Sequence, residues 1–152
     1  MFNCILSINE IKIIHSIAAT YCREKKYEIA KNILISLIDN ISTYNISSDL
    51  CLMPEIYYNL AKLFFIEKNY NNSISFANKG IDFCIKNNFS RILADLFYVM
   101  GQCYEKLGEI DNALQNYNKF ICLYDILGHD QFSLICKENL LNKYGNNTLK
   151  LI

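Results

Sequence analysis

Apolar residues recur along this chain at three- and four-residue intervals, which is the spacing of amphipathic α-helices. Short polar links interrupt the pattern, and within three successive pairs of segments the link is so short that the helices it joins must lie antiparallel. Only one Pro and five Gly occur, which argues against a loop-rich or all-β fold. The pattern therefore predicts an all-α protein of three helical hairpins and one last helix, with helices over 8–23 and 26–44, 52–67 and 70–87, 91–107 and 110–127, and 130–143.

A pattern of bulky and small residues recurs in the three hairpins. A bulky residue is followed three positions later by an apolar residue and then by a small one, and a small residue returns in the second helix. This resembles the tetratricopeptide repeat signature, W-x-x-L-G-x-x-Y…A-x-x-x-F. The copies read Phe97-x-x-Met100-Gly101-x-x-Tyr104 with Ala113-x-x-x-Tyr117, Tyr57-x-x-Leu60-Ala61-x-x-Phe64 with Ser73-x-x-x-Ala77, and Ile14-x-x-Ile17-Ala18-x-x-Tyr21 with Ala30-x-x-x-Leu34.

The resemblance implies a right-handed α-α superhelix over residues 1–144, with repeats at about 11–44, 54–87 and 94–127, a capping helix at 130–143 and a frayed tail at 145–152. The small residues let the two helices of a hairpin approach closely. One repeat cannot bury its apolar face alone, so stacking must supply the core. Further local expectations concern single positions: Pro54 in the first turn of a helix, Ser90 as an N-cap, Gly108 and Gly128 as left-handed helix ends, and Phe132, Ile135, Cys136 and Leu140 as the packing stripe of the cap.

Composition narrows the function classes. The formal net charge is zero, with 15 basic and 15 acidic residues, and no dense basic run is present, so we expect no direct nucleic acid binding by this chain. Seven cysteines without C-x-x-C spacing predict neither a disulfide framework nor a zinc ribbon but a reduced, cytoplasmic protein. No signal peptide pattern and no apolar run long enough for a bilayer occur.

The sequence contains no recognisable reaction centre. Its two histidines, His15 and His129, lie in different units without an accompanying Asp or Cys pattern, and no phosphate-binding loop or metal-binding motif appears. We therefore expect no enzyme activity, no metal and no cofactor.

In tetratricopeptide proteins the first helix of each pair lines an inner groove, and the resemblance assigns groove-facing roles to five positions of that helix. Lys62 and Gln102 could then hydrogen-bond an extended peptide, while for Phe65 a core position is the alternative. Chaperone-tail-binding relatives carry a Lys, Asn and Arg clamp that this chain lacks, so a chaperone adaptor role is not expected. The groove-facing positions hold Lys12, His15, Ala19, Cys22 and Arg23 in the first repeat, Glu55, Tyr58, Lys62, Phe65 and Ile66 in the second, and Asp95, Tyr98, Gln102, Glu105 and Lys106 in the third.

A narrower resemblance rests on the stretches 54–62, 74–88, 95–108 and 123–128. They look like the C-terminal tetratricopeptide region of peptide-responsive transcriptional regulators of Gram-positive bacteria. Those proteins carry an N-terminal helix-turn-helix DNA-binding domain, and many bind a short signalling peptide in the groove and dimerise. Here the first repeat helix begins almost at Met1, so we expect an isolated sensor domain or a stand-alone relative.

The leading hypothesis is thus a peptide-binding regulatory domain in which the peptide shifts helix packing, and the resemblance implies a homodimer. The alternative is a scaffold whose groove or convex face holds a protein partner without a small ligand. A third reading, a modulator of phosphorelay proteins, follows some relatives of the repeat class and has no marker in this sequence.

Overall fold

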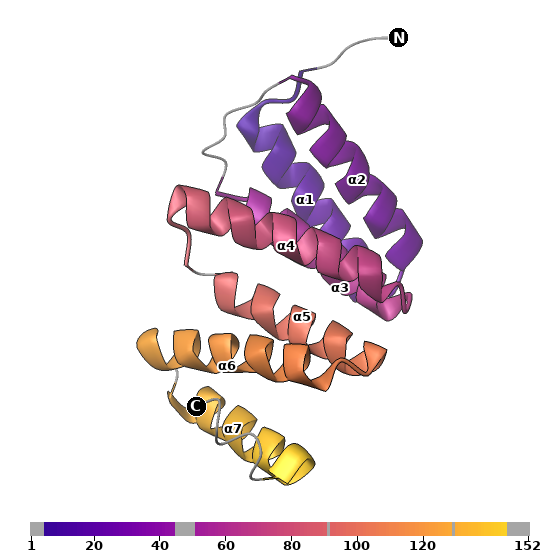
Figure 1. Ribbon diagram of the computed structural model, residues 1–152. Coiled ribbons are helices and arrows are strands. Elements are labelled where there is room, and N and C mark those ends of the chain that lie inside the picture. The colour runs from indigo at the N-terminus through magenta and orange to yellow at the C-terminus, as the bar shows by residue number, and fades with distance from the viewer. Residues whose placement is uncertain (1–4, 45–50, 91, 129, 146–152) are drawn as a thin grey trace.

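The computed structural model describes residues 5–44, 51–90, 92–128 and 130–145 and consists, within those residues, of helices without strands. Seven helices follow one another as hairpins α1/α2, α3/α4 and α5/α6 and a last helix α7, which confirms the expected all-α, tetratricopeptide-like fold class (Figure 1). The bounds agree with the predicted ones to within two residues. The helices are α1 (Ile8–Arg23), α2 (Tyr27–Thr43), α3 (Met53–Ile66), α4 (Tyr70–Asn87), α5 (Leu93–Leu107), α6 (Ile110–Ile126) and α7 (Asp130–Tyr144).

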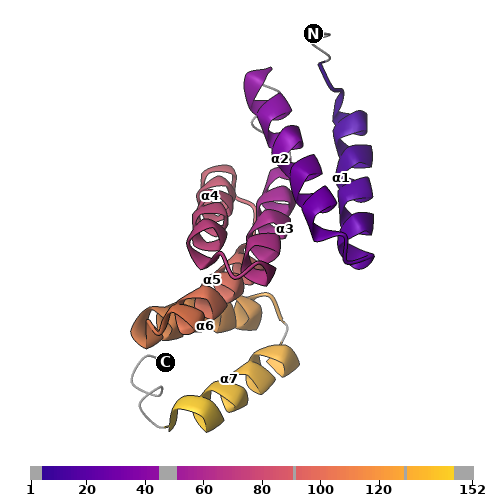
Figure 2. The same cartoon turned by 90° about the vertical axis from the view of Figure 1, so that its right-hand side faces the viewer.

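The hairpins are stacked and turned relative to one another. Seen from the side, α1 and α2 stand upright, whereas α5 and α6 lie across the lower end of the stack and α7 lies beneath them (Figure 2). The hydrophobic core is accordingly divided into three clusters that lie between successive helix pairs rather than at one centre. The clusters are built on Ile11, Leu34 and Leu60 for α1, α2 and α3, on Ala77, Leu96 and Met100 for α4 and α5, and on Ala94, Phe120 and Ile121 for α5 and α6.

The small residues of the repeat signature are the points of closest helix approach. Ala18, Ala61 and Gly101 are all buried, and a Cβ atom on Gly101 would lie 2.7 Å from the ring of Tyr117 on the partner helix. In the second hairpin the buried hydroxyl of Ser73 donates to the carbonyl of Ala61 over 2.7 Å and accepts from the thiol of Cys103 at 3.1 Å. A small polar side chain fits this position because both of its hydrogen bonds are satisfied.

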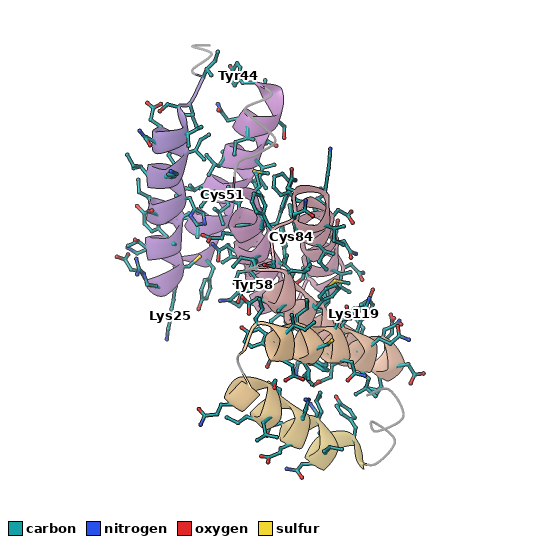
Figure 3. The ribbon with its side chains drawn as sticks, turned by 90° about the vertical axis from the view of Figure 1, so that its left-hand side faces the viewer. Lys25, Tyr44, Cys51, Tyr58, Cys84 and Lys119 are labelled. Carbon is teal, nitrogen blue, oxygen red and sulfur yellow. The ribbon has the colours of Figure 1, made fainter. Side chains whose placement is uncertain are left out.

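The turns within the three hairpins have the same conformation. Lys25, Lys68 and Gly108 occupy the equivalent position and adopt positive φ angles of 60°, 60° and 81° (Lys25 is labelled in Figure 3). The residue after each donates its backbone N–H to a carbonyl five residues earlier over 2.9 Å, so the last orphan carbonyls of each first helix are satisfied in the same way. Gly108 and Gly128 therefore behave as predicted, and Pro54 does lie in the first turn of α3.

Two local expectations were wrong. The N-cap of α5 is Ile92 rather than Ser90, because the chain makes a further turn after Ser90 in which the Leu93 N–H bonds to the Ser90 carbonyl. On α7, Cys136 and Leu140 pack against the third cluster, but Ile135 is 53% exposed, because only one narrow side of this helix faces α6. The Phe132 side chain and the predicted tail beyond Gly145 lie outside the described residues.

We expect Gly101→Ala to lower the free energy of unfolding. The new methyl group would meet the Tyr117 ring, and overpacking of this kind costs about 1–3 kcal/mol, more than the ~1 kcal/mol that alanine gains in helix propensity. Urea unfolding followed by circular dichroism measures the change. Gly80→Ala is the comparison, because its methyl group would lie 3.0 Å from the movable end of Leu96 and 3.1 Å from the Tyr57 Cβ atom, both farther than the 2.7 Å to the Tyr117 ring at position 101. If Gly80→Ala lowered the free energy of unfolding as much as Gly101→Ala, the clash with the Tyr117 ring would not be the cause.

The shared turn leads to a second prediction, in which substitutions at two equivalent positions change the free energy of unfolding in opposite directions. Lys68→Gly should raise the free energy of unfolding by up to ~1 kcal/mol, because a left-handed residue with a Cβ is strained by about 1–2 kcal/mol and glycine returns part of this as chain entropy. Gly108→Ala should lower it by about 1–2 kcal/mol for the same reason. Thermal and urea unfolding of both variants check the pair, and two changes of the same sign would rule out turn strain as the cause.

Candidate functional site

The residues expected to face a groove fall on α1, α3 and α5, and the structure brings part of them together. Tyr58 and Lys62 lie one turn apart on α3, with the Lys62 ammonium 5.1 Å from the centre of the Tyr58 ring (Tyr58 is labelled in Figure 3). Asp95 on α5 accepts a hydrogen bond of 2.9 Å from the hydroxyl of Tyr124 on α6. We call Tyr58, Lys62, Asp95 and Tyr124 the central cluster.

Tyr58, Asp95 and Tyr124 of the central cluster are half-buried, whereas Lys62 is exposed. Burial raises the pKa of the Asp95 carboxyl, an effect that the Tyr124 hydrogen bond and the Lys62 charge partly offset. Burial, followed by the nearby charge of Asp95, raises the pKa of Tyr58 to about 12. A phenol and a carboxylate thus lie in a partly dehydrated setting, where each interacts more strongly with a polar ligand than it would in water, and the exposed Lys62 ammonium lies beside them.

Next to the central cluster, α7 closes a pocket of about 150 Å³ over α5 and α6. The ring of Tyr98 lies 5.7 Å from that of Tyr117 and 4.9 Å from that of Phe120, and these rings form the apolar wall. Phe120 in turn lies 4.6 Å from Tyr124, so the pocket and the central cluster are continuous. We call this cavity the α7 pocket; its lining is Tyr98, Glu105, Tyr117, Phe120, Cys136, Asn139, Leu140 and Lys143.

Glu105 connects α7 to the rest of the pocket. Its two oxygens accept hydrogen bonds from the Tyr117 hydroxyl at 3.0 Å and from the Lys143 ammonium at 2.5 Å. Burial alone would raise the pKa of Glu105, but these hydrogen bonds, led by that of Lys143, outweigh it and hold the pKa below its ordinary value. The carboxylate is therefore charged near neutral pH and anchors the last turn of α7.

His15 has a different place from the one expected. It is 8% exposed, and its Nε2 lies 3.0 Å from the Asn59 amide nitrogen on α3, so it joins α1 to α3. Burial lowers the pKa of His15, while the charge of Glu55 acts in the opposite sense. Because the amide nitrogen can only donate, Nε2 is the acceptor and the ring is neutral in this arrangement.

The remaining predicted residues do not join one site. Phe65 is half-buried against Tyr70, with ring centres 5.6 Å apart, and packs in the second core cluster, as its alternative reading held. The Arg23 guanidinium donates to Thr20 on its own helix. Gln102 is half-buried and Lys106 exposed on α5, Lys12 lines a depression on the outer side of α1, and Glu55 lines a depression next to Phe89.

Sequence reasoning missed Asn59, Tyr124 and Lys143. Asn59 stands where the other repeats have Ser16 and Val99, so no repeat signal marks it. Tyr124 and Lys143 come from a second helix and from the cap, which the groove rule for first helices does not cover. Among the described residues no group of three or more His, Cys, Asp and Glu side chains could hold a metal ion, and no described helix is both long and apolar enough to cross a membrane.

The buried imidazole predicts a pH-dependent stability. His15 has a folded-state pKa below that of the unfolded chain, so at pH values below about 6.5 the unfolded state binds more protons and stability falls as the pH falls. His15→Gln should therefore lose less of its free energy of unfolding than the natural chain between about pH 7.5 and pH 5. Urea unfolding at a series of pH values measures both slopes. Parallel slopes would mean that His15 does not titrate in this way.

Comparisons with known proteins add the family. The sequence of residues 3–144 matches the RNPP family C-terminal domain. Two similar solved structures are those of Bacillus thuringiensis PlcR in complex with the peptide PapR7 and DNA, with a TM-score of 0.71, and of the same protein in its apo form, with a TM-score of 0.75. Both are 23% identical to this chain, of which they cover 88% and 93%.

The chain spans about half the length of those PlcR chains, 46% and 50% respectively. No curated protein matches it. The resemblance to peptide-responsive regulators noted in the sequence is confirmed at the level of the family, because the match extends over all seven helices. This chain is therefore a member of the RNPP family and corresponds to the C-terminal domain of that family.

Proposed function

We propose that this chain is a non-catalytic sensor domain of a transcriptional regulator and that it binds a short peptide along the central cluster and the α7 pocket. The observation that carries the proposal is the continuity of these two features across α3, α5, α6 and α7. One is polar and charged and the other is lined by aromatic rings, and peptide sites combine these two kinds of surface. The PlcR structure with the peptide PapR7 supports the same ligand class.

The chemistry of the two parts suggests how a peptide would lie. Lys62 can donate to a main-chain carbonyl or a carboxylate, and Asp95 can accept from main-chain N–H groups or an amino terminus. A cavity of about 150 Å³ has room for one apolar side chain, which would contact Tyr98 and Phe120. The peptide would thus be held by its backbone in the middle of the domain and by a side chain under α7.

Binding at this position would be communicated through α7. The last turn of this helix is held to α5 by the ion pair of Glu105 and Lys143, and its first half by Ser133 and Lys137, which bond to Asp125. A ligand that fills the α7 pocket would favour one placement of α7 over others, which is the requirement for a population shift. Recognition of DNA would then belong to the N-terminal half of such a regulator, in keeping with the zero net charge of this chain.

Peptide binding is tested with the natural protein and two charge reversals. Native mass spectrometry of the protein purified from its own cells should retain a peptide of a few residues, which is then synthesised. Lys62→Glu should weaken its binding about tenfold or more in isothermal titration, because the exposed ammonium beside Tyr58 and Asp95 is replaced by a carboxylate that repels the peptide's carbonyl or carboxylate oxygens.

Lys79→Glu is the matched control. Its ammonium lies 5.0 Å from the Phe76 ring on α4, so it loses the same charge and the same kind of ring contact outside the proposed site. The affinity of the Lys79→Glu variant for the peptide should stay within about twofold of that of the natural chain. Equal losses in the two variants, or purification with a stoichiometric protein partner and no peptide, would favour the scaffold function instead.

A further inference from the structure

The outer side of α1 carries an apolar stripe that the repeat pattern would place in a core. Ile13, Ile17 and Thr20 are exposed, the first two by 59% and 45%. Aligned on the small residue of the signature, their counterparts in the second repeat are Ile56, Leu60 and Leu63, with exposures of 0%, 0% and 2%, and in the third repeat Leu96, Met100 and Cys103, with 0%, 6% and 0%. The three positions are thus interior positions of this fold, and within the described residues they are exposed on α1 alone.

In the second and third repeats, the equivalent stripe on α3 or α5 is covered by the helix that comes directly before it in the sequence. Leu37 and Ile41 of α2 belong to the same cluster as Ile56 and Leu60 of α3. Ala77, Ile81 and Cys84 of α4 share a cluster with the stripe of α5, and the absent side chain of Gly80 leaves space for Leu96, whose methyl groups lie 3.0 Å from where a Cβ would be. The covering element is each time an amphipathic helix; α2 contributes large apolar residues to the contact, whereas α4 contributes the small residues Ala77 and Gly80.

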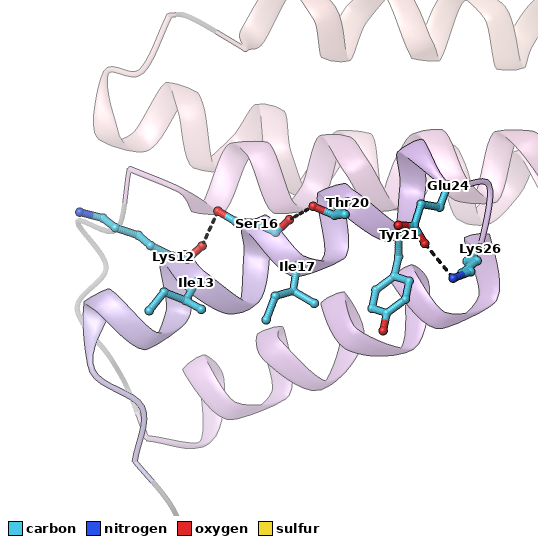
Figure 4. Close-up of a pocket in the computed structure, with 8 residues that line it drawn as sticks. All are labelled: Lys12, Ile13, Ser16, Ile17, Thr20, Tyr21, Glu24 and Lys26. Atoms are coloured by element: carbon cyan, nitrogen blue, oxygen red, sulfur yellow. Dashed lines mark hydrogen bonds and ion pairs between the residues drawn. The ribbon is translucent and has the colours of Figure 1, made fainter.

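On α1 the same stripe borders an open depression of about 650 Å³ (Figure 4). The polar groups at its rim are already satisfied on their own helix, because Ser16 donates to the Lys12 carbonyl and Thr20 to the Ser16 carbonyl. Glu24 and Lys26 form an ion pair at one end. The terminal helix of a stacked-repeat protein normally turns a polar face outward, and this stripe does not fit that rule.

We propose that the outer face of α1 is the docking site of an amphipathic helix from the N-terminal half of a regulator of this family, packed as α4 packs on α5. The matched region is the C-terminal domain, and it covers only about half of the PlcR chains, so in such a regulator the other half leads into the domain at the start of α1. A helix ending there stands in the same sequence relation to α1 as α2 does to α3 and α4 to α5. Its contact side would carry small residues opposite Ile13 and Ile17, as Gly80 does opposite Leu96. The peptide site proposed above plays no part in this inference.

A fusion tests whether the face accepts such a helix. Residues 1–6 of the full chain are replaced by a copy of residues 69–89, which contains α4, placed directly before Ser7. Because Ser7 is the repeat equivalent of Ser90, this keeps the register in which α4 precedes α5. The fusion should unfold at a Tm about 5 °C or more above that of the natural chain.

The substitution Ile17→Lys separates docking from a general effect of added chain. In the natural chain the Ile17 side chain is 45% exposed, so the substitution should lower the Tm only a little. In the fusion the side chain would be covered, and the same substitution should lower the Tm by at least about 5 °C more. Ile29→Lys, on an isoleucine 46% exposed on α2, is the matched control and should change both proteins alike.

Two outcomes overturn the proposal. One is an Ile17→Lys effect of equal size in the fusion and the natural chain, which would mean that no helix covers the stripe. The other is a natural chain that sediments as a dimer and is dissociated by Ile17→Lys, which would assign the face to a second copy of this chain.

Discussion

The close approach of paired helices at their small residues is the constraint on which the rest of the structure depends. Gly101 leaves the space that the Tyr117 ring fills, and Ser73 reaches the backbone of the neighbouring helix at Ala61. Closed hairpins of this kind still have one uncovered apolar side, because two helices cannot surround a core. The first two clusters therefore join one hairpin to the next, and the third joins the last hairpin to α7, so the order of the stack follows from the order of the chain.

The candidate site is a consequence of this stacking. The first helices α3 and α5 come to lie near each other, so that Tyr58, Lys62 and Asp95, which are far apart in sequence, form one cluster. Tyr124 and the α7 pocket extend it, since α6 and α7 continue the stack on the same side. The same logic explains the exposed stripe of α1: at the N-terminal end of a stack, the side that would contact the previous repeat is left without a cover.

The charge of this chain fits a division of tasks within a family of regulators. The numbers of acidic and basic residues are equal, so the chain lacks the basic excess of a typical nucleic acid-binding domain, which agrees with the ligand-sensing function proposed above. The Glu105–Lys143 ion pair holds α7 at its last turn, and the apolar contact of α7 with the third cluster comes from the partly buried side chains of Cys136 and Leu140. A helix held in this way can be repositioned at low cost, which the sensor function proposed above requires.

By itself the sequence determined the helices, the hairpins, the repeat class and the family, because each depends on local spacing: apolar residues at helical intervals, small residues at Ala18, Ala61 and Gly101, and a turn residue at Gly108. It also supplied candidate site residues on α3 and α5 through the repeat pattern. Only the tertiary structure decided which of them meet. The burial of His15 against Asn59, the pairing of Asp95 with Tyr124 and the closure of a pocket by Lys143 depend on the angles between successive hairpins. Those angles result from the packing of many side chains across the hairpin interfaces, and no local periodicity encodes them.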